Sequence, residues 1–194
     1  MDIRINYKVV TTRAEIDAYL DGAKVVAYDY EAAPDEPCRA DPGAALDPNR
    51  CHICTVSLSV AEGTGIMIPV AHKTGENMDP KEFAQFLRGF LTDKTIVKVA
   101  HNIAYESALA YRLGIVTQPP VYDTICASQM TLKNCFGFRR LADSGLKKLA
   151  AELCCESLPT FTEVTAGRHF DELDPSDPAT MLVITSDDAG EVSS

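Results

Sequence analysis

The sequence predicts an α/β fold in which a mixed central sheet carries helices on both faces. Two observations support this prediction. Three strand-like segments follow one another in the first seventy residues, and from residue 79 onwards helical patterns surround one further short strand. Successive strands favour antiparallel pairing, whereas strands that alternate with helices favour parallel pairing, so both kinds are expected in one sheet.

The first helix is expected to begin at Thr12. Its hydroxyl is placed to cap the helix, Glu15 completes a capping box, and Ile16 and Leu20 form an apolar face. Residues 24–30 follow as a short apolar run that predicts a buried strand.

Residues 32–52 contain four prolines and no apolar periodicity, which predicts a long irregular excursion. Two strands are expected next, over residues 53–60 and 65–70, and the four residues 61–64 between them favour a hairpin.

The helix expected after the hairpin starts at Asp79-Pro80 and ends at Leu91, with phenylalanine and leucine side chains along one face. The remaining expected elements are a short strand at 95–100 and helices at 103–113, 123–132 and 144–153.

Composition sets limits on the kind of protein. A chain of 194 residues with 46% hydrophobic residues is typical of a single globular domain, here residues 1–194. The sequence lacks an apolar run long enough for a membrane span and lacks a signal peptide, so we expect a cytoplasmic protein without a membrane partner. The net charge of −10 argues against a free-standing nucleic-acid binder, because phosphate binding then requires bound cations or a basic neighbouring domain.

Two carboxylates lie two residues apart at the end of the first predicted strand. Asp29 and Glu31 therefore share one face of that strand. Neighbouring carboxylates repel each other, and a divalent metal ion is the commonest way to stabilise both as anions. The alternative is that both residues simply end the strand in solvent.

A second polar segment runs from the strand at 95–100 into the next helix. Asn102 and Glu106 are four residues apart, which predicts that they lie on one helix face. The alternative is structural: Asn102 caps the helix, and Glu106 lies on the surface, where the helix dipole favours it.

These two segments resemble the motifs of a known family. Asp29-Tyr30-Glu31 resembles the first exonuclease motif (D-x-E) of family A DNA polymerases, and Asn102 with Glu106 resembles the second (N-x-x-x-D). The similarity continues in the same order along the chain, through Tyr122-Asp123-Thr124-Ile125, Gly145-Leu146-Lys147-Lys148-Leu149-Ala150, Leu158-Pro159-Thr160-Phe161-Thr162-Glu163-Val164 and Thr185-Ser186-Asp187-Asp188-Ala189. The last of these segments corresponds to the third motif.

The resemblance implies a ribonuclease H-like fold and a DEDD-type 3′-5′ exonuclease. It implies that the metal-binding and catalytic carboxylates are Asp29, Glu31, Glu106 and Asp188, which would hold two Mg²⁺ or Mn²⁺ ions. The implied substrate is the 3′ end of single-stranded or frayed DNA, and the implied partner is a covalently following polymerase domain. Phe161 resembles the aromatic residue that stacks on the terminal bases, and a core phenylalanine is its alternative.

The sequence departs from the family pattern at two positions. Glu106 replaces an aspartate, which keeps the charge and lengthens the side chain. Ile184 stands where relatives carry a tyrosine that orients the attacking water, and an alkyl group cannot do this. The chain also ends six residues after Asp188, so we expect a truncated domain. The alternative function is therefore a catalytically degenerate module with a structural or nucleic-acid-binding role beside a polymerase.

Histidine and cysteine residues give two further candidates. His101 is placed either to face the substrate or to satisfy a strand end. Cys51 and Cys54 have zinc-ligand spacing and Cys38 lies upstream, but a second ligand pair is missing. This favours unrelated cysteines over a zinc site.

Overall fold

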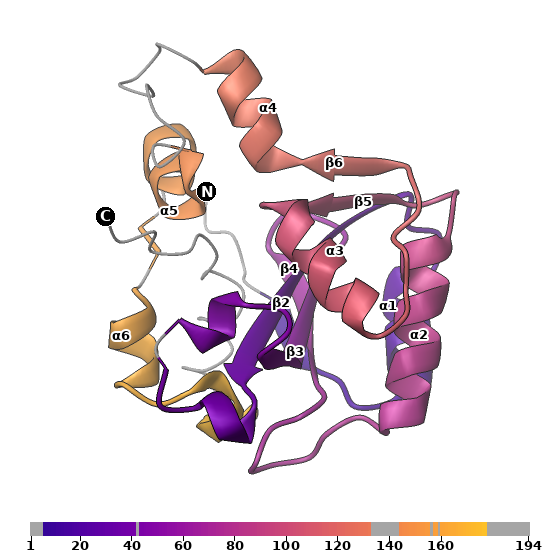
Figure 1. The fold of residues 1–194 in the computed structure, drawn as a ribbon. Coiled ribbons are helices and arrows are strands. Elements are labelled where there is room, and N and C mark those ends of the chain that lie inside the picture. Colours follow the sequence, from indigo (N-terminus) through magenta and orange to yellow (C-terminus); the bar gives the residue numbers. More distant parts are fainter. Residues whose placement is uncertain (1–5, 42, 133–143, 156, 159, 178–194) are drawn as a thin grey trace.

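Six strands form one mixed sheet in the order β1-β4-β3-β2-β5-β6 (Figure 1). The structure, a computed structural model, describes residues 6–41, 43–132, 144–155, 157–158 and 160–177. The strands are β1 (Asn6–Val9), β2 (Val25–Pro34), β3 (Cys51–Ser59), β4 (Thr64–Pro69), β5 (Val97–Ala100) and β6 (Val121–Asp123). Strands β2, β3 and β4 pair antiparallel, and β1 with β4, β2 with β5 and β5 with β6 pair parallel. The predicted mixed sheet is confirmed.

Five helices follow the predicted order, and a sixth, α6 (Phe161–Thr165), was not predicted. The five are α1 (Arg13–Leu20), α2 (Pro80–Thr92), α3 (Ile103–Arg112), α4 (Thr124–Thr131) and α5 (Leu146–Leu149). A π-helical turn (Ala150–Cys154) extends α5, and short 3₁₀ turns lie at Glu36–Cys38, Ala44–Leu46 and Phe170–Glu172. Of the helices in the described ranges, none is long and apolar enough to cross a membrane.

The helix caps confirm two expected starting points. Thr12 Oγ1 accepts a hydrogen bond from the backbone N–H of Glu15, and α1 begins at the next residue after Thr12. Asp79 Oδ1 accepts from the backbone N–H groups of Lys81 and Glu82 at the start of α2. Each cap satisfies N–H groups that the helix itself leaves without partners.

Three parts of the sheet differ from the expectation. Strands β1 and β6 were not predicted, and both lie at the edges of the sheet. Strand β2 continues to Pro34, four residues past its predicted end, so only the part after it is an excursion. That excursion contains two 3₁₀ turns and leads into β3.

Helical segments cover both faces of the sheet. On one face, Ile16 of α1, Phe86 of α2 and Leu109 of α3 pack with Val26 and Leu58 in the large core. Figure 1 shows α1 beside α2 and α3 in front of β5. On the opposite face, a smaller cluster joins Phe170 and Leu173 to the strand residues Ala33, Cys54 and Met67. The predicted fold class is thereby confirmed.

Candidate active site

Asp29 and Glu31 lie within β2, opposite β3. In the register of the two strands Asp29 faces Ser57 and Glu31 faces Thr55. Asp29 is partly buried, and the exposed fraction of Glu31 is only 4%. The alternative in which both carboxylates end the strand in solvent is therefore wrong, because β2 continues beyond them and covers Glu31.

The pairing of β2 with β3 is irregular beside Glu31. The register shifts between Glu31 and Ala32, so Cys54 of β3 is an extra residue between Ile53 and Thr55. The Cys54 thiol donates a hydrogen bond of 3.1 Å to the Glu31 carbonyl oxygen. Such a bulge bends the strand and redirects its side chains, and bulges are frequent next to active sites.

Glu106 is buried in α3, with an exposed fraction of 1%. Two contacts hold α3 against the excursion that follows β2. Tyr105 Oη donates to the Ala45 carbonyl oxygen at 2.5 Å, and Arg112 Nη2 lies 2.8 Å from Asp35 Oδ2. Helix α3 is thus fixed at both ends, and the alternative that places Glu106 on the surface is wrong.

The carboxylates of Asp29 and Glu106 lie near the same two tyrosines. Burial raises the pKa of Tyr28, and the negative charges of Glu106 and then Asp29 raise it further. The pKa of Tyr30 is raised by burial, by Tyr28 and by the same two carboxylates. Electrostatic interaction weakens with distance, so both carboxylates act on the same two tyrosines although one lies on a strand and the other on a helix far along the sequence. We call this pair of carboxylates, Asp29 and Glu106, the acidic centre.

An open cavity of about 300 Å³ adjoins this centre, with Asp29 and His101 in its wall. His101 has an exposed fraction of 7%. Its Nδ1 lies 2.8 Å from Thr124 Oγ1, and no partner for its Nε2 occurs among the residues that the structure describes. Burial lowers the pKa of His101, which favours the neutral ring.

The hydroxyl of Thr124 indicates which ring nitrogen carries the proton. Thr124 Oγ1 donates to the Ala100 carbonyl oxygen at 3.4 Å, so its oxygen is left to accept from Nδ1–H of His101. Nε2 then carries a lone pair and is a buried hydrogen-bond acceptor.

Asn102 and Asp123 meet at the start of α3. Asn102 has a left-handed backbone (φ 66°), its side chain makes no capping bond, and it is exposed. Asp123 caps the helix instead: its carboxylate accepts from the backbone N–H groups of Asn102 at 3.2 Å and Ile103 at 3.1 Å. Since Asn102 precedes the helix, the predicted common helix face with Glu106 does not form.

Asp123 also caps α4, because Oδ1 accepts from the backbone N–H of Ile125 at 2.9 Å. Sequence reasoning quoted this residue as part of a family segment and gave it no role. Its position as an aspartate at the start of the predicted helix over 123–132 is the signal that could have identified it as a cap.

The other predicted site residues are placed as follows. Phe161 is the first residue of α6, which Thr160 and Glu163 close with a reciprocal capping box. Asp188 and Ile184 lie outside the described residues.

The zinc alternative is not supported by the positions of its cysteines. Cys51 packs in the large core and Cys54 in the smaller cluster on the opposite face of the sheet. Burial raises the pKa of Cys54 well above its ordinary value, so this residue is a neutral thiol. In the part of the chain that the structure describes, no three His, Cys, Asp or Glu side chains are grouped around a possible metal position.

The carboxylates nevertheless have the donor chemistry of a divalent ion site. Asp29, Glu31 and Glu106 offer hard oxygen ligands, which Mg²⁺ and Mn²⁺ prefer. Two of the three are almost fully buried, and a buried carboxylate is costly unless hydrogen bonds or a cation compensate it. Their donor chemistry suits such an ion, although the three side chains are not grouped around one metal position in the described residues, and Asp188 is the fourth ligand that the sequence predicts.

Comparisons with known proteins identify one related sequence and several similar structures. The chain is 26% identical over 159 residues to DNA polymerase I of Chloroflexus aurantiacus; this stretch is 81% of the chain and 15% of the polymerase. Among solved structures, Brucella melitensis NrnC with bound Mg²⁺ is 21% identical with a TM-score of 0.62, covering 93% of this chain and 73% of that one. Trypanosoma brucei RNase D in complex with RNA U12 is 17% identical with a TM-score of 0.63, covering 94% and 62%. These structures share the fold.

A family model described as 3′-5′ exonuclease matches residues 7–168. This range contains Asp29, Glu31 and Glu106 on β2 and α3, together with His101 and Asp123. Because the match extends over most of the chain, the protein belongs to the 3′-5′ exonuclease family of nucleases.

Proposed function

We propose that this chain is a metal-dependent 3′-5′ exonuclease domain that hydrolyses DNA from the 3′ end, and that it serves as a proofreading domain of a DNA polymerase I-like protein. The observation that carries the proposal is the acidic centre formed by Asp29 of β2 and Glu106 of α3, with Glu31 buried on the same strand. Similarity to a DNA polymerase I supports the choice of DNA and of a neighbouring polymerase domain.

In this proposal Asp29, Glu31, Glu106 and Asp188 hold two Mg²⁺ or Mn²⁺ ions. Bound divalent ions would activate a water and stabilise the leaving 3′ oxygen in an in-line displacement. A relative with bound Mg²⁺ supports this choice of ion. The ions also explain how a chain with a net charge of −10 would act on a polyanion, since they offset the carboxylates.

The remaining predicted residues contact the substrate. His101 lies in the wall of the cavity beside Asp29 and contacts the substrate there, and its Nε2 is a buried acceptor without a partner among the described residues. Asn102, exposed at the start of α3, is placed to donate to a phosphate or a base. Phe161 stacks on the terminal bases, as its place in the family segment implies.

The experiment follows degradation of a 5′-labelled single-stranded DNA with Mg²⁺ or Mn²⁺. Wild-type protein should give a ladder of 3′-shortened products, and Asp29→Ala should give none. The matched control is Asp17→Ala, which removes an aspartate that pairs with Arg13 on the surface of α1. This control should cut as the wild type does.

The same assay with an RNA strand tests the substrate class, because RNase D of Trypanosoma brucei was solved with RNA. If neither strand is shortened at any metal concentration, the exonuclease proposal fails. The degenerate module, which the replacement of the family tyrosine by Ile184 motivates, would then take its place.

A further inference from the structure

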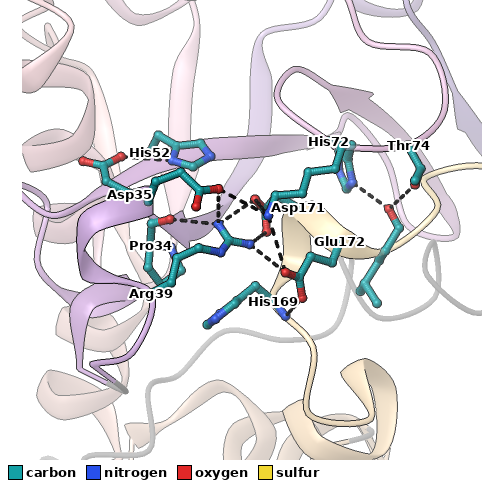
Figure 2. Close-up of polar contacts among 12 residues, drawn as sticks. Pro34, Asp35, Arg39, His52, His72, Thr74, His169, Asp171 and Glu172 are labelled. Atoms are coloured by element: carbon teal, nitrogen blue, oxygen red, sulfur yellow. Dashed lines mark hydrogen bonds and ion pairs between the residues drawn. The ribbon is translucent and has the colours of Figure 1, made fainter.

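Arg39, in the excursion after β2, donates hydrogen bonds to Asp171 from both terminal nitrogens of its guanidinium (Figure 2). Nη1 lies 2.9 Å from Asp171 Oδ2, and Nη2 lies 2.8 Å from Oδ1 and 2.9 Å from Glu172 Oε1. The Asp171 side chain has an exposed fraction of 3%. The hydrogen bond from Arg39 lowers the pKa of Glu172 to about 2. This is a partly buried, bidentate ion pair of high directional specificity, in which the Asp171 carboxylate is the buried partner.

The same guanidinium contacts the end of β2. Nη1 of Arg39 donates to the Pro34 carbonyl oxygen at 3.1 Å. Pro34 is the last residue of β2 and lies three positions after Glu31. Arg39 therefore ties Asp171 directly to the strand that carries two predicted catalytic carboxylates.

A histidine makes a second connection on the other side of Glu31. His72 Nδ1 lies 3.0 Å from the Leu173 carbonyl oxygen, and Nε2 lies 2.6 Å from Thr55 Oγ1. Burial lowers the pKa of His72, so the ring is neutral. A carbonyl can only accept, so Nδ1–H donates to Leu173 and Nε2 accepts from the Thr55 hydroxyl. Thr55 is the residue of β3 that faces Glu31.

Apolar packing joins the same segment to the sheet between these two connections. Phe170 and Leu173 pack with Ala33 and Cys54, and the Cys54 thiol donates to the Glu31 carbonyl oxygen. Residues 170–173 thus contact the strand pair directly at Ala33 and Cys54 and, through His72, at Thr55 opposite Glu31.

We infer that residues 170–173 form a latch that fixes the Glu31 end of β2, and that Arg39 is a positioning residue of the carboxylate site. The need for a latch follows from the bulge between Glu31 and Ala32, where the ladder of β2 and β3 is interrupted. The role of Arg39 in metal binding rests on the proposed function, whereas the fixing of β2 does not.

The experiment compares the wild type with two variants. Arg39→Gln removes both the charge and the bidentate guanidinium, whereas Arg39→Lys keeps the charge and removes the bidentate geometry. Arg50→Gln is the matched control, because Arg50 belongs to the same excursion and its guanidinium pairs with the exposed Asp41 at 2.8 Å. Two properties are measured on each full-length, metal-free protein: Mn²⁺ affinity by titration calorimetry and amide hydrogen exchange of a peptide spanning residues 29–38.

Arg39→Gln should weaken Mn²⁺ binding about tenfold, as loss of supporting contacts around a metal site does. It should also accelerate exchange in residues 29–38 by about tenfold, because the strand end opens more often. Arg39→Lys should fall between Arg39→Gln and the wild type in both measurements, and Arg50→Gln should match the wild type. Should Arg39→Gln fail to fold, Arg39→Lys still carries the test.

The two readouts separate the latch from the proposed function. Wild-type exchange rates in both Arg39 variants would overturn the latch, whatever Mn²⁺ affinity is measured. Faster exchange with unchanged, Asp29-dependent Mn²⁺ affinity would overturn the positioning role. Absence of Asp29-dependent Mn²⁺ binding in the wild type would overturn the proposed metal site and leave the latch to be judged by exchange alone.

Discussion

Nδ1 of His101 lies 2.8 Å from Oγ1 of Thr124, and this contact fixes the orientation of a buried ring in the cavity wall. The two residues come from the end of β5 and the start of α4. The ring is therefore held by a residue of another element, and the direction in which its Nε2 points is fixed. Such preorganisation is expected of a residue that contacts a substrate.

Thr124→Val should disturb His101 without changing the shape of the site. The methyl group cannot accept from Nδ1–H, so we expect a stability loss of about 1 kcal/mol and lower nuclease activity. Thr124→Ser keeps the hydroxyl and should behave as the wild type. Urea unfolding and the DNA ladder assay measure the two effects, and equal activity of the valine and serine variants would argue against a role for His101.

Acidification should destabilise the protein through its buried histidines. Burial lowers the pKa of both His72 and His101 from 6.5, so the unfolded chain binds more protons than the folded one below about pH 6.5. The free energy of unfolding should be highest above this pH and fall as the pH drops towards the folded pKa values. Urea unfolding at pH 7.5 and at steps down to pH 5 measures this slope, which should be smaller in His72→Asn and His101→Asn.

Asp123→Ala should cost more stability than loss of an ordinary helix cap. Asp123 accepts from three backbone N–H groups at the starts of α3 and α4, so we expect a loss of about 2 kcal/mol, the upper end for a cap. Asp79→Ala, which removes the cap of α2 alone, is the control and should cost less. Thermal unfolding compares them. Equal losses would mean that the double cap contributes no more than a single one.

Glu106→Gln should abolish the negative charge at nearly constant shape. If Glu106 is a catalytic carboxylate, activity should fall about a hundredfold or more while the fold persists. Glu82→Gln, an exposed position in the first turn of α2, should leave activity unchanged. Circular dichroism and the ladder assay together distinguish loss of function from loss of fold, and an active, folded Glu106→Gln variant would remove Glu106 from the site.

Thiol reactivity should separate the exposed cysteines from the buried ones. Cys126, Cys154 and Cys155 are exposed and should react with iodoacetamide in the native protein. Cys51 and Cys54 are buried, and burial raises the pKa of both, so they should react only after unfolding. Mass spectrometry of digested protein reads out each position. Rapid native labelling of Cys54 would contradict the bulge contact with Glu31.

Local patterns predicted the elements whose periodicity is strong. The amphipathic face of α2 and the capping residues Thr12 and Asp79 are local signals, and the structure confirms them. Strand β6 is three residues long and mostly exposed, so no apolar alternation marks it; backbone pairing with β5 alone defines it. Strand β1, at the other edge of the sheet, is also short, and its pairing with β4 defines it.

The candidate site shows the same division between local and long-range information. Spacing and family resemblance selected Asp29, Glu31 and Glu106, but spacing cannot distinguish a surface Glu106 from a buried one, because burial depends on how α3 packs against parts of the chain that are distant in sequence. The pair of Arg39 and Asp171 is separated by 132 residues, so no local pattern contains it.

The 132-residue separation of Arg39 and Asp171 also bears on the order of folding. The antiparallel strands β2, β3 and β4 are neighbours in sequence and can pair early, whereas contacts across long loops form late because closing the loop costs entropy. A growing chain would thus present Asp29 and Glu31 on a formed sheet before residues 170–173 have been synthesised. If residues 170–173 hold the Glu31 end of β2 as proposed, ordering of that strand end is coupled to the synthesis of these four residues, so that a nascent chain that stops short of them has a less ordered β2.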